Sequence, residues 1–185
     1  SKYTMILQPT GVILDDLIVT NAHTPQEAAA WAEGSAATDF VVVANAGNRH
    51  AVLAALTERI TTAERTFDVT VTDTHRALIA VQGPAAQAIL EDLVAAGRLT
   101  LDASSGATLA DLRYYRSAPG TFDGEIVTLG RTGYTGEDGF EISIAPDLAV
   151  TLWEAIVAVG QPHGLALAGL ASRDTLRLEA GMPLY

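Results

Sequence analysis

Short apolar or alternating stretches between turn residues predict a series of β-strands along the chain. They cover residues 3–7, 11–20, 40–44, 67–72, 77–81, 109–116, 125–129 and 140–144. The stretches at 40–44 and 77–81 are continuously apolar, so these two strands are predicted to be buried. Residues 117–124 are rich in turn formers and predict a turn, whereas residues 24–38 predict a loop or a short helix.

Apolar residues at helical spacing predict helices between these strands. They run from Asn48 as N-cap to about residue 63, from Pro84 to Gly97, and over 146–159 and 170–180. The helix at 146–159 is predicted to bury Leu152, Trp153 and Ile156, and Gly181 is predicted to cap the last helix. The order of elements predicts an α+β protein with mainly antiparallel sheets, helices packed on one face and a ferredoxin-like element in the second half.

Two adjacent aspartates interrupt the strand predicted at residues 11–20. Neighbouring side chains of a strand face opposite sides, so either Asp15 or Asp16 must stand among aliphatic side chains. An unpaired carboxylate there is costly, and aspartate is depleted in strands. One interpretation is an edge hairpin with a bulge that frees both carboxylates to water. The other is a carboxylate positioned for a cationic or hydrogen-bond-donating ligand.

Residues 131–141 read RTGYTGEDGFE and lie between two predicted strands. Glycines at 130, 133, 136 and 139 predict a tightly folded connection that can approach a ligand closely. Polar side chains able to contact something project from it: Arg131, Tyr134, Glu137, Asp138 and Glu141. The segment is either a hairpin with a solvated, charged tip or one wall of a binding site.

Two further segments contain candidate functional residues. Arg173 falls in the first turn of the last predicted helix, where the helix dipole disfavours a cation. Either Asp174 beside it neutralises that charge, or Arg173 and the helix N-terminus together bind an anion. Tyr114 and Tyr115 lie in a predicted strand and so are expected on opposite faces. Either one packs in the core and the other meets a flat ring, or both are ordinary core or rim tyrosines.

Composition narrows the class of protein. The 185-residue chain has a formal net charge of −11 and lacks the positive field that nucleic acid binding needs. No apolar run reaches the roughly 18 residues of a membrane span. Cysteine is absent and the four histidines are scattered, so no metal site is expected. The start lacks the apolar core of a signal peptide, and we expect a cytoplasmic location in a bacterium or the mitochondrial matrix in a eukaryote.

Four blocks of the sequence resemble, in the same order, the T-proteins of the glycine cleavage system, a family of tetrahydrofolate-dependent aminomethyltransferases. The blocks are Gly11–Val19 (GVILDDLIV), Val81–Pro84 (VQGP), Arg131–Glu141 and Arg173–Tyr185 (RDTLRLEAGMPLY). The resemblance implies an enzyme that takes an aminomethyl group from the lipoyl arm of H-protein. The one-carbon unit passes to tetrahydrofolate, the co-substrate, and ammonia is released. H-protein and tetrahydrofolate are thus the implied partners.

The resemblance also implies roles for single residues. Asp16 matches the residue held to be essential in the family, placed against the reacting nitrogens of the folate. Tyr134 and Glu141 match residues that contact the pterin and neighbouring parts of the folate, and Arg173 matches an arginine at the same site. A carboxylate suits both tasks, since it accepts hydrogen bonds from ring N–H groups and stabilises a nearby positive charge.

The family pattern extends these expectations to Tyr3, Asn45 and Tyr115, which fall where the lining of its folate pocket lies. It implies a folate-binding α+β domain to which residues 1–75 contribute and a second α+β domain over residues 76–185. Family members begin before and continue beyond the sequence similar to this chain, so we expect a central fragment without the family's C-terminal barrel domain. Whether such a fragment is active by itself is left open at this point.

Two other functions fit the same residues. One is the folate domain of a folate-dependent demethylase or of a sarcosine- or dimethylglycine-oxidase type of protein. The sequence GYTGEDGFE favours the T-proteins over those relatives. The other is a folate-binding or assembly protein without transferase chemistry, against which the presence of Asp16 argues.

Overall fold

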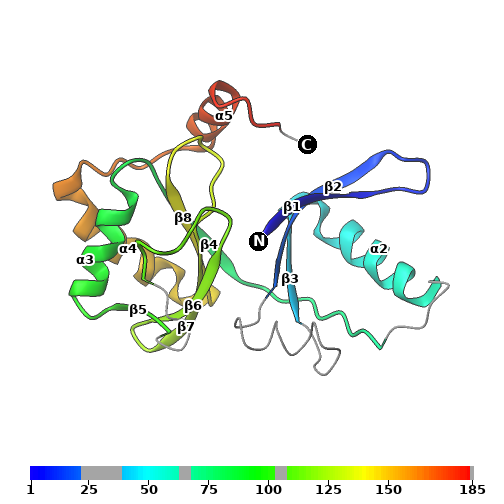
Figure 1. The fold of residues 1–185 in the computed structure, drawn as a ribbon, viewed down its shortest axis with the longest axis horizontal. Coiled ribbons are helices and arrows are strands. Elements are labelled where there is room, and N and C mark those ends of the chain that lie inside the picture. Colours follow the sequence, from blue (N-terminus) through cyan, green and yellow to red (C-terminus); the bar gives the residue numbers. More distant parts are fainter. Residues whose placement is uncertain (22–38, 63–67, 103–107, 184–185) are drawn as a thin grey trace. The chain divides into compact units, whose positions relative to one another are not determined.

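The computed structural model describes residues 1–21, 39–62, 68–102 and 108–183, and the chain divides into two compact units (Figure 1). The first unit covers residues 1–74 and the second covers residues 75–184. The segment 24–38, predicted as a loop or short helix, lies outside the described residues.

The first unit is a small antiparallel sheet with one helix. Its strands are β1 (Lys2–Leu7), β2 (Ile13–Asn21) and β3 (Phe40–Ala44), in the order β1-β2-β3. A short 3₁₀ helix, η1 (Ala46–Asn48), leads from β3 into α2 (Arg49–Thr62). The β1–β2 hairpin closes through Gly11, whose φ of +84° is readily adopted by glycine.

The buried core of the described part of the first unit is small. Ile6, Leu17 and Val52 form it, so that β1, β2 and α2 each contribute one buried apolar side chain. The prediction that β3 is buried is wrong, because Phe40 is 53% exposed and its three valines are 38–49% exposed. The physical reason is that β3 is an edge strand, paired only with β2 among the described strands.

The second unit is built on a five-stranded antiparallel sheet. Its strands are β4 (Ala77–Gln82), β5 (Leu99–Leu101), β6 (Ser117–Phe122), β7 (Glu125–Gly130) and β8 (Gly139–Ile144). They lie in the order β4-β8-β7-β6-β5. The helices are α3 (Ala86–Ala95), α4 (Ala149–Gly160) and α5 (Leu170–Glu179), with the short 3₁₀ helices η3 (Pro146–Leu148) and η4 (Gln161–His163) on either side of α4.

One face of this sheet is covered by α3 and α4, as the α+β prediction requires (Figure 1). Alternate strand residues point into the core, for example Val127 and Leu129 of β7, which are fully buried. The strand β4 is half-buried and not buried as predicted, because Leu78 on its other face is 50% exposed. Trp153 is also misassigned to the core, since it is 43% exposed on α4.

The strand predicted at residues 109–116 and most of the turn predicted at 117–124 are exchanged in the structure. Residues 109–111 and 114–115 form turns, Ser117–Phe122 is the strand β6 between β5 and β7, and only residues 123–124 form a turn as predicted. Pro119 and Gly120 are poor strand formers and misled the prediction. Gly120 belongs there because a Cβ at this position would lie 2.2 Å from the carbonyl oxygen of Thr100 in β5.

Tyr114 and Tyr115 accordingly do not alternate across a strand. Tyr115 has a φ of +60°, a left-handed backbone conformation that is uncommon outside glycine. The two rings instead contact each other edge to face, with centroids 4.6 Å apart and planes at 82°.

The helix ends were predicted with mixed success. Gly181 caps α5 as predicted, with a φ of +70° and the paired backbone bonds of a Schellman motif. Asn48 was predicted to cap α2, but it belongs to η1, and its side chain donates to Asp15 and to the carbonyl of Leu14. The strand predicted at 67–72 is also wrong, since residues 68–72 have no regular structure.

Candidate functional site

The two aspartates of β2 have different surroundings. Asp15 is fully buried and Asp16 is half-buried. The interpretation in which a bulge exposes both carboxylates to water is therefore wrong. The pairing of β1 with β2 does shift between Ile6 and Leu7, close to this point. The irregularity therefore lies beside the aspartates, but it exposes only one of them to solvent.

Asp15 accepts hydrogen bonds from three donors. The backbone N–H of Asn45 binds one carboxylate oxygen at 3.0 Å. The side-chain amides of Asn45 and Asn48 bind the other oxygen at 2.8 and 3.0 Å. These donors replace the water that the buried carboxylate has lost, which offsets its desolvation. Asp15 thereby anchors the turn between β3 and α2.

Asp16 is held by two of the residues that the family resemblance assigned to the pocket lining. The hydroxyl of Tyr3 donates to one carboxylate oxygen at 3.0 Å, and the side-chain amide of Asn45 donates to the other at 2.5 Å. Each oxygen keeps acceptor capacity, because a carboxylate oxygen has two lone-pair sites. Asp16 is thus oriented from β1 and from the end of β3 while part of it faces solvent.

Asn45 links the two carboxylates. Its amide nitrogen carries two hydrogens, and it contacts Asp15 and Asp16 with the same nitrogen. The buried carboxylate therefore fixes the orientation of the amide, and the amide fixes the exposed carboxylate. This arrangement gives Asp15 a structural role and leaves Asp16 as the carboxylate that a ligand can reach.

The second group of candidate residues surrounds the glycine-rich loop, residues 131–138 between β7 and β8. Arg131, at its start, uses all five N–H donors inside the protein. It donates to both carboxylate oxygens of Asp138 at 2.8 and 2.6 Å, and to the Gln87 side chain at 3.0 Å. The remaining two bonds, at 3.1 and 3.0 Å, go to the carbonyls of Leu109 and Leu112.

Arg131 and Asp138 therefore brace the loop and are not free to contact a ligand, contrary to one interpretation of the sequence. The hydrogen bond between them, with their opposite charges, lowers the pKa of Asp138 and raises that of Arg131. The Arg131 side chain is only 16% exposed, and it lies over the ring of Phe140. The pair closes the loop at its two ends.

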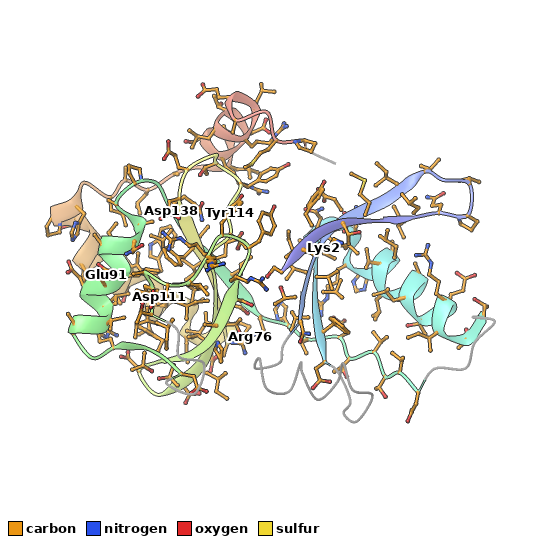
Figure 2. The ribbon with its side chains drawn as sticks, viewed as in Figure 1. Lys2, Arg76, Glu91, Asp111, Tyr114 and Asp138 are labelled. Atoms are coloured by element: carbon orange, nitrogen blue, oxygen red, sulfur yellow. The ribbon has the colours of Figure 1, made fainter. Side chains whose placement is uncertain are left out.

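Glu141 follows the loop in β8 and is half-buried. The hydroxyl of the buried Thr132 donates to its Oε2 atom through a short hydrogen bond. Tyr114 is its electrostatic neighbour, since partial burial of the phenol, Tyr115 and the negative charge of Glu141 all raise the pKa of Tyr114. Figure 2 shows Tyr114 at the end of the sheet where the loop projects. The Glu141 carboxylate therefore lies close to the hydroxyl of Thr132 and to the ring of Tyr114, which in turn contacts Tyr115.

Tyr134, in the same loop, lies against Arg173 of α5. The guanidinium carbon of Arg173 lies 5.2 Å from the centroid of the Tyr134 ring. Asp174 pairs with Arg177 at 2.6 Å, so it does not serve Arg173 as one interpretation of the sequence required. A groove of about 640 Å³ runs here, lined by Tyr134 and by Leu170, Ala171, Arg173, Asp174 and Arg177 of α5.

The tip of the loop also touches this helix. A Cβ added to Gly136 would lie 2.5 Å from that of Ala180, directly after α5. The candidate residues therefore form two groups, each within one unit. Tyr3, Asp16 and Asn45 belong to the first, and the second is made of Tyr115, Tyr134, Glu141 and Arg173 with Tyr114.

Sequence reasoning missed several residues that hold these groups in place. Asn48 was assigned only to a helix cap, and Thr132 and Gln82 received no role. Gln82 contacts residues 50 or more positions later, at Thr132 and Phe140. No local pattern signals such contacts, because they exist only once β4 has paired with β8.

The described residues contain no group of three or more His, Cys, Asp or Glu side chains arranged to hold a metal ion. The helices among them also lack the length and apolar character to cross a membrane. The candidate side chains carry carboxylates, hydroxyls, aromatic rings and a guanidinium group.

Comparisons with known proteins agree on one family. Residues 1–185 match the family model described as the GCVT N-terminal domain. The chain is 46% identical to an aminomethyltransferase of Streptomyces coelicolor and 42% identical to one of Cutibacterium acnes, in both cases over its whole length. It spans only 43% and 45% of those relatives.

A solved structure gives the same result for the fold. The crystal structure of glycine cleavage system aminomethyltransferase T from Bartonella henselae matches with a TM-score of 0.72 and 34% sequence identity. The match covers 99% of this chain and 41% of that chain.

Proposed function

The chain belongs to the GCVT N-terminal domain family, and from that premise we propose that it carries the folate-binding and catalytic side chains of a glycine cleavage system aminomethyltransferase. Such an enzyme transfers the one-carbon unit of aminomethyl-lipoyl H-protein to tetrahydrofolate and releases ammonia. The observation that carries the proposal is Asp16, a half-exposed carboxylate oriented by Tyr3 and Asn45. The enzyme would work in the bacterial cytoplasm, in glycine catabolism and one-carbon metabolism.

Asp16 acts in this proposal mainly by electrostatics and orientation. Loss of ammonia from an aminomethyl group leaves positive character on the carbon that is transferred, and a fixed carboxylate stabilises it. The bonds from Tyr3 and Asn45 hold the carboxylate in one orientation before the substrate arrives, so little reorganisation is needed during the reaction. Each oxygen keeps a lone-pair site for the donors or the charge of the substrate.

The side chains of the second unit suit a pterin. A pterin ring presents a row of N–H donors that a carboxylate accepts in pairs. Thr132 occupies one site on Oε2 of Glu141 and leaves the Oε1 atom available for such donors. The rings of Tyr115 and Tyr134 offer flat apolar surface, and Arg173 offers a positive charge beside Tyr134. Bound tetrahydrofolate supplies the nitrogens that accept the one-carbon unit.

The deciding experiment measures ammonia release from aminomethylated, lipoylated H-protein, with and without tetrahydrofolate. It is run on this chain and on the full-length form of the protein. We expect folate-stimulated release from the full-length form. If tetrahydrofolate binds but stimulates no release, the protein is a folate-binding protein without transferase chemistry. If dimethylglycine or sarcosine replaces H-protein as the one-carbon donor, it belongs with the demethylases.

A further inference from the structure

Building on the proposed function, we propose that Gln82, the last residue of β4, is a positioning residue for the folate contacts. Its carboxamide acts on the glycine-rich loop and not on the ligand. It closes the loop by hydrogen bonds and occupies space that only glycine residues leave free. Tyr134 and Glu141 depend on it for their orientation.

The hydrogen bonds of Gln82 join the two ends of the loop. Its Nε2 atom donates to the carbonyl of Thr132, near the start of the loop, at 3.1 Å. The same nitrogen donates to the carbonyl of Phe140, just after the loop, also at 3.1 Å. Both amide hydrogens are thereby used, one on each side. The backbone N–H of Gly83 adds a bond of 2.7 Å to the carbonyl of Asp138.

The glycines at 133 and 139 are explained by the same carboxamide. A Cβ at Gly133 would lie 1.9 Å from Oε1 of Gln82, and a Cβ at Gly139 would lie 2.3 Å from that atom. Neither glycine has a positive φ, so the backbone itself would accept another residue. Gly136 differs, because its φ is +79°. Gly133 in the loop and Gly139 directly after it therefore make room for Gln82.

The residues that Gln82 holds stand directly beside the proposed folate contacts. Thr132, whose carbonyl it binds, donates its hydroxyl to Glu141. Phe140, the other carbonyl partner, precedes Glu141 in β8. Tyr134 lies between the two tethered ends. Without the carboxamide, the loop would keep the Arg131–Asp138 pair but lose the inner contacts that orient these two side chains.

A double-mutant cycle tests the contact independently of folate. Gly133→Ala should lower the melting temperature by about 5 °C, since its methyl group would displace the carboxamide and break its bonds to the carbonyls of Thr132 and Phe140. In the Gln82→Ala background, where the carboxamide is missing, the same change should cost much less. Gln82→Met keeps the volume but loses the two hydrogen bonds, so its flexible end can move aside and Gly133→Ala should again cost less than in the parent. Equal shifts in all three backgrounds would overturn the steric part of the proposal.

The functional test compares tetrahydrofolate binding and turnover in the full-length form. Gln82→Ala and Gln82→Met should both weaken tetrahydrofolate binding, seen as a roughly 10-fold rise in Kd and KM. We expect kcat to change less than about threefold, because Asp16 is untouched. Gln161→Ala is the matched control, since Gln161 is an exposed glutamine of η4. It should leave binding unchanged.

The outcomes separate this proposal from the proposed function. A parent protein that binds tetrahydrofolate while both Gln82 variants bind it equally well would overturn only the positioning role. A proportional loss of kcat at unchanged KM would also overturn it, since that pattern assigns Gln82 to the chemical step. A parent that binds no tetrahydrofolate would overturn the proposed function, and with it the role of Gln82 in folate binding.

Discussion

The two units hold their candidate residues by different means. In the described part of the first unit the buried apolar core is Ile6, Leu17 and Val52, and β3 leaves its apolar side chains exposed. In the second unit the core takes side chains from all five strands and from α3 and α4. The first unit fixes Asp16 through side-chain hydrogen bonds, whereas the second fixes a loop that joins two inner strands, β7 and β8, of a well-packed sheet.

The contrast teaches that precise side-chain placement does not require a large core nearby. Tyr3 and Asn45 orient Asp16 by direct hydrogen bonds, and Asp15 in turn holds the amide of Asn45. The glycine-rich loop instead depends on braces that reach back to β4 and α3, through Gln82 and Gln87. The following predictions test how far the two modes differ, from the largest expected effect to the smallest.

The largest effect should come from truncating one buried leucine in each core. Leu93→Ala in α3 removes a fully buried leucine and should cost about 4 kcal/mol of unfolding free energy. Leu17→Ala in β2 should cost about 2 kcal/mol, because fewer side chains surround the cavity. Hydrogen exchange in urea reports on both units at once. Equal losses would contradict the contrast between the cores.

Next comes the proposed catalytic carboxylate. Asp16→Asn should reduce folate-stimulated ammonia release by about 100-fold or more, since it removes the charge but keeps the shape. The melting temperature should change little, because Asp16 is partly exposed. Asp147→Asn, an exposed acid in η3, is the matched control and should retain full turnover. Unchanged turnover in Asp16→Asn would remove this residue from the mechanism.

The buried neighbour should affect stability as well as activity. The Asp15 carboxylate accepts three hydrogen bonds. Asp15→Asn turns an NH₂ group toward some of these donors, which should lower the free energy of unfolding by about 2 kcal/mol. The loss should appear in hydrogen exchange of β2 and of the β3–α2 turn, and not in the second unit. A variant as stable as the parent would mean that the polar network does not hold the first unit together.

The pterin contact should have a smaller effect, on binding alone. Glu141→Ala should weaken tetrahydrofolate binding about 10-fold, because it removes a charged acceptor. Calorimetry measures the change. Glu125→Ala, at the exposed start of β7, is the control in the same sheet. Equal affinity in the Glu141 variant would place the pterin elsewhere.

The smallest effect should come from the ion pair that braces the loop. The pKa of Asp138 is lowered in the folded chain, so its stabilising contribution is present above the unfolded pKa of about 3.9 and disappears as the pH falls through the lower, folded value. Asp138→Asn should therefore lower the melting temperature by a few degrees at pH 7, and by less below about pH 4. A difference that grows in acid would contradict this assignment.

Local patterns were enough for most elements of this protein. Alternation of apolar and polar residues predicted β7 and β8, and the glycine at 181 predicted the end of α5, because periodicity and capping involve only neighbouring residues. The same logic identified the conflict at Asp15 and Asp16, since one of two adjacent strand residues must face inward. The family could be identified from four short blocks.

Tertiary structure decided which residue does what. Only the pairing of β1, β2 and β3 buries Asp15 and leaves Asp16 accessible, with Asn45 between them. Only the place of β6 between β5 and β7 makes a strand of a segment with proline and glycine. From the sequence, Arg131 of the glycine-rich loop was a candidate ligand contact. In the fold, Arg131 is fully used as a brace, because its partners come from distant segments that no local pattern connects.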